Sequence, residues 1–400
     1  MPTLNCRPPI AGARYMQLLV AYISSTRVAS RRMRPNLFWR TLEPAAFRVL
    51  PRFSGSAIRA TGQPFTRPGM LKPHVGGHRY GWTHYGVMIP DLPEPHRYFS
   101  TMVIAGLPGA TALDNDHAVT TTPRDTVTVS VSTAAPGAAF FRAYSMAEEC
   151  RLEPDGSLLD FGGDVIIEGG YPNFRVTVRR DGFTADLRLR ANGQVAWFAR
   201  IPAYDHLSLF VEYEGWVANG GERTEVSGVG TFEYAACVGL HGLVDRPFGA
   251  AAKVPLDFFS YQVIGIDDRT HLLLADVHVS GKPLVTMAYH RSAGRPTWVS
   301  HTGVRFEVTE YTAETTADPY GNRMRLPVRF TWTAGDDLIV HGTVDSPPRF
   351  GVGRGYILGY RCHGNFQGRE FDSRGYMEYI DNEQANRAAP DYLTGLPTPH

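Results

Sequence analysis

The chain of 400 residues is 43% hydrophobic and 20% charged, which is typical of a globular protein with a large core. Its formal net charge of +1 conceals an uneven distribution of charge. Residues 1–70 contain eleven Arg, no Lys and one acidic residue, Glu43, which leaves 29 of the 40 basic and 38 of the 39 acidic residues in the remainder. This acidic body has no basic stripe and no familiar nucleic-acid motif, so we expect no nucleic-acid partner.

Cysteine spacing and hydropathy narrow the class further. Cys6, Cys150, Cys237 and Cys362 lie far apart and form no CxxC pair, which argues against a zinc site or a disulfide framework and fits a reducing compartment. No run of 18 apolar residues is present. GxSxG, HExxH and Walker A sequences are also absent. We therefore expect a cytoplasmic protein that uses neither a metal nor another cofactor.

Residues 1–79 are predicted to form a basic extension of helix and loop. Patchy helical periodicity covers 13–28 and 37–50 and is interrupted by prolines. An Arg-rich, acid-poor segment of this kind is typical of a targeting segment or of an amphipathic arm on a membrane surface. An arm that docks on the folded body is an equally open interpretation.

From residue 81 onward the pattern changes to strands. Aromatic residues make up 12% of the chain, and 41 Gly and 29 Pro supply many turns. Alternation with a period of two recurs at 126–131, 164–168, 174–178 and 185–190, with Asp-Gly or Asn-Gly turns between several runs. Short strands at this spacing, without intervening helices, predict a mostly β protein built from antiparallel barrels or sandwiches.

A long-period repeat predicts two related β modules. Gly230-Thr231-Phe232-Glu233-Tyr234 is echoed by Gly375-Tyr376-Met377-Glu378-Tyr379, a spacing of 145 residues between the glutamates. The module openings echo less closely, with the strand that begins at Tyr85 resembling the one that begins at Tyr261. We predict an extension over 1–79, a first module over 80–236, a linker over 237–249, a second module over 250–385 and a tail over 386–400.

The linker and the second module carry a family resemblance. A Val-Asp-Arg-x-x-Gly linker at 244–249 leads into the aromatic strand 258–262, then to 267–268 and 272–274, and the chain closes on a Gly-Tyr-x-Glu strand. This arrangement resembles the lipocalin-like two-barrel superfamily of carotenoid 1,2-hydratases (hydroxyneurosporene synthases), kievitone hydratase and tocopherol-cyclase-like proteins, as a bacterial subgroup. The resemblance implies two lipocalin-like barrels that enclose a hydrophobic terpenoid, polyketide or lipid.

Hydration, isomerisation or cyclisation of such a ligand requires an acid in a dry pocket, because a buried carboxyl stays protonated and can donate to a C=C bond. The stretch from Trp82 to His117 is dense in groups that can move protons. The catalytic candidates are Asp245, Asp91 and Asp116 as acids, His84 and His117 as proton shuttles, and Tyr261 as a hydroxyl donor. The ligand-binding candidates are Tyr85, Trp82, His96, Phe248, Phe259 and Trp216.

Each candidate also has a plain structural interpretation. Asp245 next to Arg246 could form an interdomain salt bridge, and the segment around Asp116 could be a simple turn. For the whole chain, the alternative to an enzyme is a lipocalin-like carrier that holds a lipid or terpenoid without changing it. The sequence leaves this choice, the substrate, the oligomeric state and peripheral membrane contact open.

Overall fold

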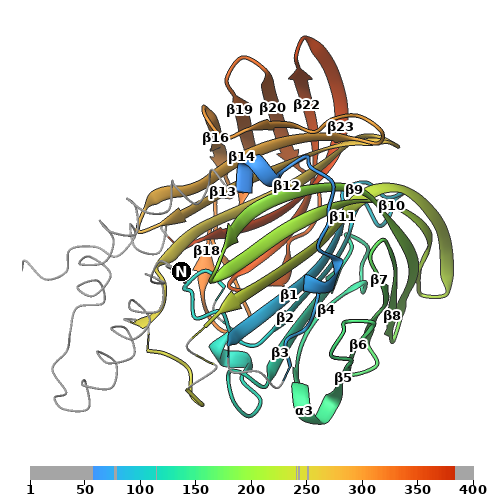
Figure 1. The fold of residues 1–400 in the computed structure, drawn as a ribbon. Coiled ribbons are helices and arrows are strands. Elements are labelled where there is room, and N and C mark those ends of the chain that lie inside the picture. Colours follow the sequence, from blue (N-terminus) through green and yellow to red (C-terminus); the bar gives the residue numbers. More distant parts are fainter. Residues whose placement is uncertain are drawn as a thin grey trace, which may run out of the picture.

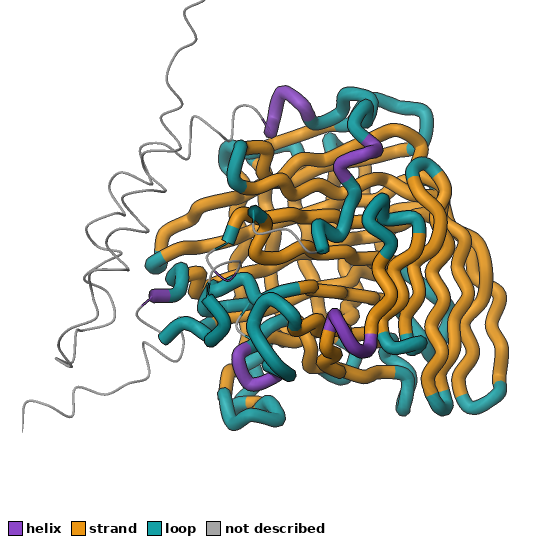
Figure 2. The backbone as a smooth tube through the Cα atoms, turned by 60° about the horizontal axis from the view of Figure 1, so that its bottom comes forward, coloured by secondary structure: helices purple, strands orange, loops and turns teal. Residues whose placement is uncertain are grey.

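The computed structural model describes residues 57–75, 79–113, 115–239, 241, 244–249 and 252–382. Two large antiparallel sheets, each curled around its own core, form barrel-like modules (Figure 1). Strands make up most of the described backbone, loops and turns make up most of the rest, and helices are confined to short turns (Figure 2). The predicted mostly β fold with two barrel-like modules is thus confirmed. Most of the predicted basic extension lies outside the described residues.

The first sheet has eleven strands in the order β4-β3-β2-β1-β11-β10-β9-β8-β7-β6-β5. Their bounds are β1 (Tyr80–Ile89), β2 (Phe99–Ala105), β3 (Thr126–Ser132), β4 (Ala139–Ser145), β5 (Cys150–Leu152), β6 (Leu158–Phe161), β7 (Val165–Gly170), β8 (Asn173–Arg180), β9 (Phe183–Ile201), β10 (Tyr204–Asn219) and β11 (Glu222–Val238). Short helices η1 (Pro68–Met70), η2 (Asp116–Ala118) and α3 (Met146–Glu149) lie before or within this run. The first strand of this sheet in chain order, β1, therefore pairs with the last, β11.

The second sheet has ten strands, nine of them in the order β15-β14-β13-β12-β23-β22-β20-β19-β16, with β21 paired to β22. Their bounds are β12 (Leu256–Asp267), β13 (Thr270–Val279), β14 (Lys282–Ser292), β15 (Trp298–Ser300), β16 (Val304–Tyr311), β19 (Pro327–Ala334), β20 (Leu338–Val344), β21 (Arg349–Val352), β22 (Gly355–Phe366) and β23 (Arg369–Asp381). A small separate ribbon pairs β17 (Thr316–Ala317) with β18 (Arg323–Met324). Here too the first strand of the sheet in chain order, β12, pairs with the last, β23. The shared strand order does not by itself test the predicted sequence repeat, which stays a prediction.

The two sheets also pack against each other through their outer faces. Alternate residues of a strand point to opposite faces, so one set fills the core of its own module and the other set meets the partner sheet. Met88 and Tyr98 of the first sheet belong to the same buried cluster as Leu273, Tyr289 and Tyr376 of the second. We call this cluster and the polar groups within it the inter-sheet layer.

Charged side chains at the edge of the inter-sheet layer join the two sheets. The Arg97 guanidinium, in the turn after β1, donates to both carboxylate oxygens of Asp345 at 2.5 Å, and Arg361 reaches the same carboxylate at 2.8 Å. Arg349 of β21 donates to the backbone carbonyls of Thr133 and Ala134, at 3.1 and 2.8 Å. These bonds fix how the sheets sit on one another.

The two openings that echo in sequence do not occupy equivalent positions. Tyr85 lies opposite Tyr234 and packs in the core of the first module, whereas Tyr261 lies opposite Glu378 and faces the inter-sheet layer. A shift of one residue moves a side chain to the other face of a sheet. When the two closing strands are aligned on their glutamates, Tyr85 and Tyr261 are therefore one residue out of register, and their proposed equivalence is wrong.

Candidate functional site

The last strand of each sheet carries one buried glutamate into the inter-sheet layer. Glu233 of β11 is 3% exposed and Glu378 of β23 is 1% exposed. Their neighbours in sequence, such as Phe232 and Met377, fill the cores of the two modules, so the strand alternation directs both carboxyls outward, between the sheets. Two carboxyl groups in an otherwise largely apolar layer are costly to bury without a function or partners.

Two imidazoles face the Glu233 carboxyl. His84 Nε2 of β1 and His206 Nε2 of β10 lie 3.9 and 3.7 Å from Glu233 Oε2. The opposite ring nitrogens are held, since His84 Nδ1 lies 2.9 Å from the Val103 carbonyl and His206 Nδ1 lies 2.8 Å from the Tyr204 hydroxyl. The distances to the carboxyl exceed those of direct hydrogen bonds, and Glu233 Oε1 is buried without a hydrogen-bond partner among the described residues. The Glu233 carboxyl can therefore accept a hydrogen bond from a further polar group or from a water molecule.

A glycine and a partly exposed histidine shape the surroundings of Glu233. Gly86 lies directly opposite Glu233 on β1, and a Cβ there would come within 2.7 Å of the Met88 methyl carbon and within 3.1 Å of the His84 ring. The absent side chain therefore gives the imidazole its room. His206 keeps 17% of its side chain exposed, although its Nε2 atom, which faces Glu233, is buried.

The second carboxyl is held by hydroxyl groups. The Tyr376 hydroxyl donates to Glu378 Oε1 at 2.6 Å and lies 3.0 Å from Ser100 Oγ of the first sheet. Tyr261, opposite Glu378 on β12, reaches Thr231 Oγ1 at 3.5 Å, two residues before Glu233 on the same face of β11. Hydroxyl groups thus connect the surroundings of the two glutamates across the inter-sheet layer.

The surroundings push the two glutamates toward opposite protonation states. Burial raises the pKa of Glu378 well above its ordinary value, the hydrogen bond from Tyr376 opposes this only in part, and the negative charge of Glu233 adds to it. Burial alone would also raise the pKa of Glu233, but His206 and His84 outweigh it and hold the pKa of that carboxyl below its ordinary value. Burial therefore favours the neutral form of Glu378, while the two imidazoles favour the ionised form of Glu233.

A buried cation lies beside Glu233. Arg291 of β14 is fully buried, and its guanidinium donates to the Ser208 carbonyl at 2.8 Å and to Ser208 Oγ at 3.0 Å, across the inter-sheet layer. It also donates to His271 Nε2 at 2.8 Å. Burial lowers the pKa of Arg291 to about 10, so it stays charged at neutral pH. Because Ser208 lies directly opposite Glu233, the cation is fixed next to the acceptor carboxylate.

Three of the predicted site residues meet in this layer. His84 faces Glu233, and Tyr261 lies between the two glutamates as described above. Trp82 is buried in the same layer, with its ring 5.8 Å from that of Tyr204, which in turn contacts His206. Phe259 packs partly buried at the edge of the layer.

The three predicted acids lie elsewhere. Asp245 is exposed in the linker and makes no ion pair with a described residue, Arg246 included, so it lacks the dry surroundings that its predicted role requires. Asp91 is 53% exposed after β1, with Arg374 at 3.8 Å. Asp116, in the short helix η2, forms an ion pair with the buried Lys253.

The remaining candidates are dispersed over the molecule. Tyr85 is inside the first core, where its ring meets Tyr234 edge-on. His96 Nδ1 lies 3.3 Å from Thr133 Oγ1. His117 stacks on Tyr320, Phe248 stacks on His241, and Trp216 lies under the Arg223 guanidinium at 4.6 Å. These contacts bring none of them to the glutamates.

The sequence did contain a signal for the residues that were missed. Glu233 and Glu378 are the glutamates of the Gly-aromatic motif that ends in Glu-Tyr and predicted the two modules. That motif was interpreted as a sign of the fold alone. Each glutamate stands alone in a run of otherwise uncharged residues, 226–238 and 375–380, and such a position is unusual because carboxylates are rarely buried without a partner.

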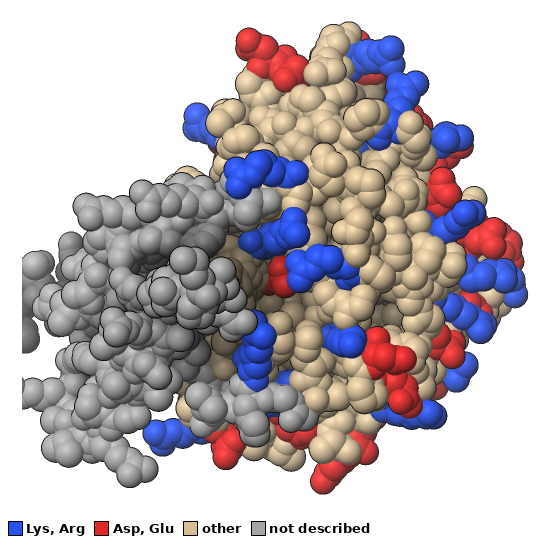
Figure 3. Space-filling view, viewed as in Figure 1, with Lys and Arg blue, Asp and Glu red and all other residues tan. Residues whose placement is uncertain are grey.

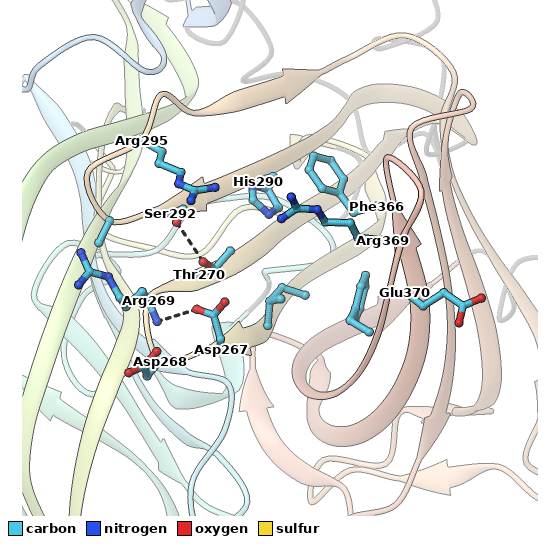
Figure 4. A pocket seen from close by; sticks show the side chains of 13 residues that line it. Asp267, Asp268, Arg269, Thr270, His290, Ser292, Arg295, Phe366, Arg369 and Glu370 are labelled. Atoms are coloured by element: carbon cyan, nitrogen blue, oxygen red, sulfur yellow. Dashed lines mark hydrogen bonds between the residues drawn. The ribbon is translucent and has the colours of Figure 1, made fainter.

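Surface clefts open away from this cluster. One of about 570 Å³ lies on the second sheet and is lined by residues of β12, β13, β14, β22 and β23 (Figure 4). On the face in Figure 3, acidic side chains lie mostly around the outline and several Lys or Arg lie nearer the middle. Within the described ranges no group of three or more His, Cys, Asp or Glu could hold a metal ion, and no helix is long and apolar enough to cross a membrane.

Solved structures are similar to this chain at low sequence identity. A protein described as AttH from Nitrosomonas europaea is 14% identical, with a TM-score of 0.54 over 80% of this chain and 97% of that one. Kievitone hydratase from Nectria haematococca is 12% identical, with a TM-score of 0.47 over 80% and 96%. CghA is 9% identical, with a TM-score of 0.48 over 80% and 95%. At such identity the first likeness shows the fold alone.

Sequence comparisons give the family. No curated protein matches the chain. The subgroup suggested by the resemblance to carotenoid and kievitone hydratases therefore stays a prediction. A model of DUF6670, described as a family of unknown function, matches residues 102–391, well over half of the chain, and the protein therefore belongs to that family.

Proposed function

We propose that the inter-sheet layer catalyses acid-promoted hydration, isomerisation or cyclisation of a hydrophobic, unsaturated substrate, using side chains alone. Glu378 would donate a proton to the substrate, and Glu233, with His84 and His206, would accept one. The terpenoids, polyketides and lipids expected from the sequence fit an apolar layer lined by Tyr, Met and Phe side chains.

One observation carries this proposal: two buried glutamates in one layer have surroundings that push their pKa values in opposite directions. Such a separation equips a site with an acid and a base at the same pH. A purely structural carboxyl would more simply be paired with a cation, as Asp345 is with Arg97. Glu378 instead accepts a hydrogen bond from the uncharged Tyr376 hydroxyl, and burial favours its neutral form.

In a hydration, the Glu378 proton would form a new C–H bond at one carbon of the double bond. Water would form a C–O bond at the other carbon and lose a proton to Glu233 or to an adjacent imidazole. The enzyme would be restored when that proton leaves through His206, the member of the cluster that reaches solvent, and Glu378 is reprotonated. Isomerisation and cyclisation use the same donor and acceptor without the added water.

Arg291 favours substrates that develop negative charge on oxygen. Its guanidinium is fixed beside Glu233, and no carboxylate of a described residue lies within 4 Å of it. A positive field in a dry layer stabilises an enolate-like oxygen and disfavours an isolated carbocation. Among the expected classes, an unsaturated carbonyl compound, as in polyketides, is therefore favoured over a plain polyene.

The test begins with the compound that the protein retains. Mass spectrometry of an organic extract, from protein purified out of a lipid-rich host, is expected to show a stoichiometric unsaturated compound. That compound is then incubated with wild type, Glu378→Gln, Glu233→Gln and the control Glu314→Gln, whose side chain is exposed. We expect turnover by wild type and the control only. Retention of the compound without turnover by any protein would instead identify a carrier.

A further inference from the structure

The cleft on the second sheet is separate from the inter-sheet cluster. It has a volume of about 570 Å³, within the range of small-molecule sites, and lies where β13 and β14 meet the β22–β23 hairpin (Figure 4). Ile266, Phe366 and Phe371 line it and also pack on the core of the second module, so its floor is apolar. Nothing in the proposed chemistry uses this cleft.

Three arginines line the cleft without an acidic partner. Arg269, Arg295 and Arg369 form no ion pair with any residue in the described ranges, whereas many other surface arginines of the chain do. In Figure 4 the guanidinium groups of Arg295 and Arg369 lie toward His290, while the carboxyls of Asp268 and Glu370 lie away from it. Two guanidinium groups are therefore available to a ligand at the middle of the cleft.

The acidic residue nearest to the middle of the cleft, Asp267, already accepts a backbone hydrogen bond. Asp267 accepts a hydrogen bond from the backbone N–H of Arg269 at 2.8 Å, which closes the turn between β12 and β13. Burial lowers the pKa of His290, the negative charge of Asp267 opposes this in part, and the nearby Arg295 lowers it further. The imidazole is therefore neutral at pH 7 and adds a hydrogen-bonding ring but no charge.

One wall of the cleft is flat and aromatic. The His290 and Phe366 rings stack with centroids 4.2 Å apart and planes 4° from parallel. Trp298 meets the Phe366 ring edge-on at 5.1 Å, which holds the pair in place. A rigid ring surface next to guanidinium groups suits a planar ligand that carries an anionic group.

The turns that carry the arginines are held by hydrogen bonds. Gln194 of the first sheet donates to the carbonyls of Ser292 and Arg295, at 2.7 and 3.1 Å, and accepts from Thr297 at 3.0 Å. The hairpin that precedes Arg369 is fixed by Gln367, whose backbone N–H donates to the Asp337 carbonyl at 2.7 Å. A cleft whose rim is fixed before binding loses less entropy when a ligand enters.

We propose that this cleft binds a planar, aromatic or conjugated carboxylate, with the carboxylate between Arg295 and Arg369 and the ring against the His290–Phe366 stack. Two guanidinium groups can form paired, charge-assisted hydrogen bonds with a carboxylate. The apolar floor and the aromatic wall take the rest of the molecule. This site is independent of the proposed acid–base chemistry, and its occupation needs no turnover.

Isothermal titration of the full chain with 2-naphthoate tests the proposal. We expect saturable binding, and we expect 2-naphthamide, which lacks the charge, to bind about tenfold more weakly. The double substitution Arg295→Gln and Arg369→Gln should weaken 2-naphthoate binding by a similar factor. Arg305→Gln is the matched control, because Arg305 is an exposed arginine of the same sheet that pairs with Glu307. Its binding should equal that of wild type.

Two further arms complete the test. Phe366→Ala should weaken 2-naphthoate, and inorganic phosphate, which has the charge but no ring, should bind more weakly than 2-naphthoate. The proposal is overturned if 2-naphthoate shows no saturable binding, if the double variant binds as wild type does, or if phosphate binds equally well. Loss of activity at the inter-sheet glutamates leaves these results unchanged, so the two proposals fail independently.

Discussion

Replacing Glu378 with Gln should make the protein progressively more stable than wild type as pH rises. The buried carboxyl has a pKa well above its ordinary value of 4.5 because burial disfavours its charged form. Gln has the same shape, is always neutral and can still accept the hydrogen bond from Tyr376. The variant therefore removes the titration and keeps the packing.

The sign and the magnitude follow from proton linkage. Above pH 4.5 the unfolded chain releases the Glu378 proton while the folded chain keeps it, so wild-type stability falls as pH rises, up to the folded-state pKa. For one proton the slope is about 1.4 kcal/mol per pH unit once the unfolded carboxyl is ionised. Between pH 5.5 and 6.5, the unfolding free energy of Glu378→Gln should therefore rise relative to wild type, by up to about 1 kcal/mol.

Equilibrium urea unfolding at several pH values measures this difference directly. Glu314→Gln is the control, because it makes the same substitution at an exposed side chain. Its difference from wild type should stay constant with pH. A flat difference for Glu378→Gln as well would show that Glu378 is ionised in the folded protein, and the assignment of the proton donor would be refuted.

Three further substitutions test the architecture and the site. Asp345→Asn breaks the paired bonds to the buried Arg97 guanidinium and should lower the unfolding free energy in urea by about 3 kcal/mol. Gly86→Ala should push the His84 ring away from Glu233, which shifts the His84 ring resonances in NMR spectra and lowers turnover roughly tenfold. Asp245→Asn should leave turnover unchanged and unfolding free energy within about 0.5 kcal/mol, because the side chain is exposed.

The fold was predictable because strand alternation is a local property. A period of two and turn residues at 181–182 predicted antiparallel sheets, and the structure confirms this turn between β8 and β9. The second predicted turn, at 192–193, is wrong, because these residues lie at an irregularity within β9. The register in which the strands pair could not be predicted in the same way. Tyr85 and Tyr261 begin similar sequences, but pairing with a distant closing strand decides which face each side chain takes. That pairing depends on contacts far apart in the chain, which no local pattern contains.

The site was predictable only in part, for the same reason. His84 and Tyr261 were selected for their chemistry, and the structure brings both to the inter-sheet layer. Asp245 was selected from its place in the linker, where nothing in the sequence reveals that it remains exposed. Glu233 and Glu378 are part of a repeated sequence motif, but their importance follows from their burial between the two sheets. Burial of that kind is a property of the assembled fold.

Infrared difference spectroscopy at pH 7 tests the opposite protonation of the two glutamates most directly. Subtracting the spectrum of Glu378→Gln from that of wild type should leave the carbonyl band of a neutral carboxyl group. Subtracting that of Glu233→Gln should leave only the bands of an ionised carboxylate. The account predicts one donor and one acceptor at the same pH. If both subtractions leave carboxylate bands, or both leave neutral ones, the inter-sheet layer has no acid–base pair and the proposed chemistry is contradicted.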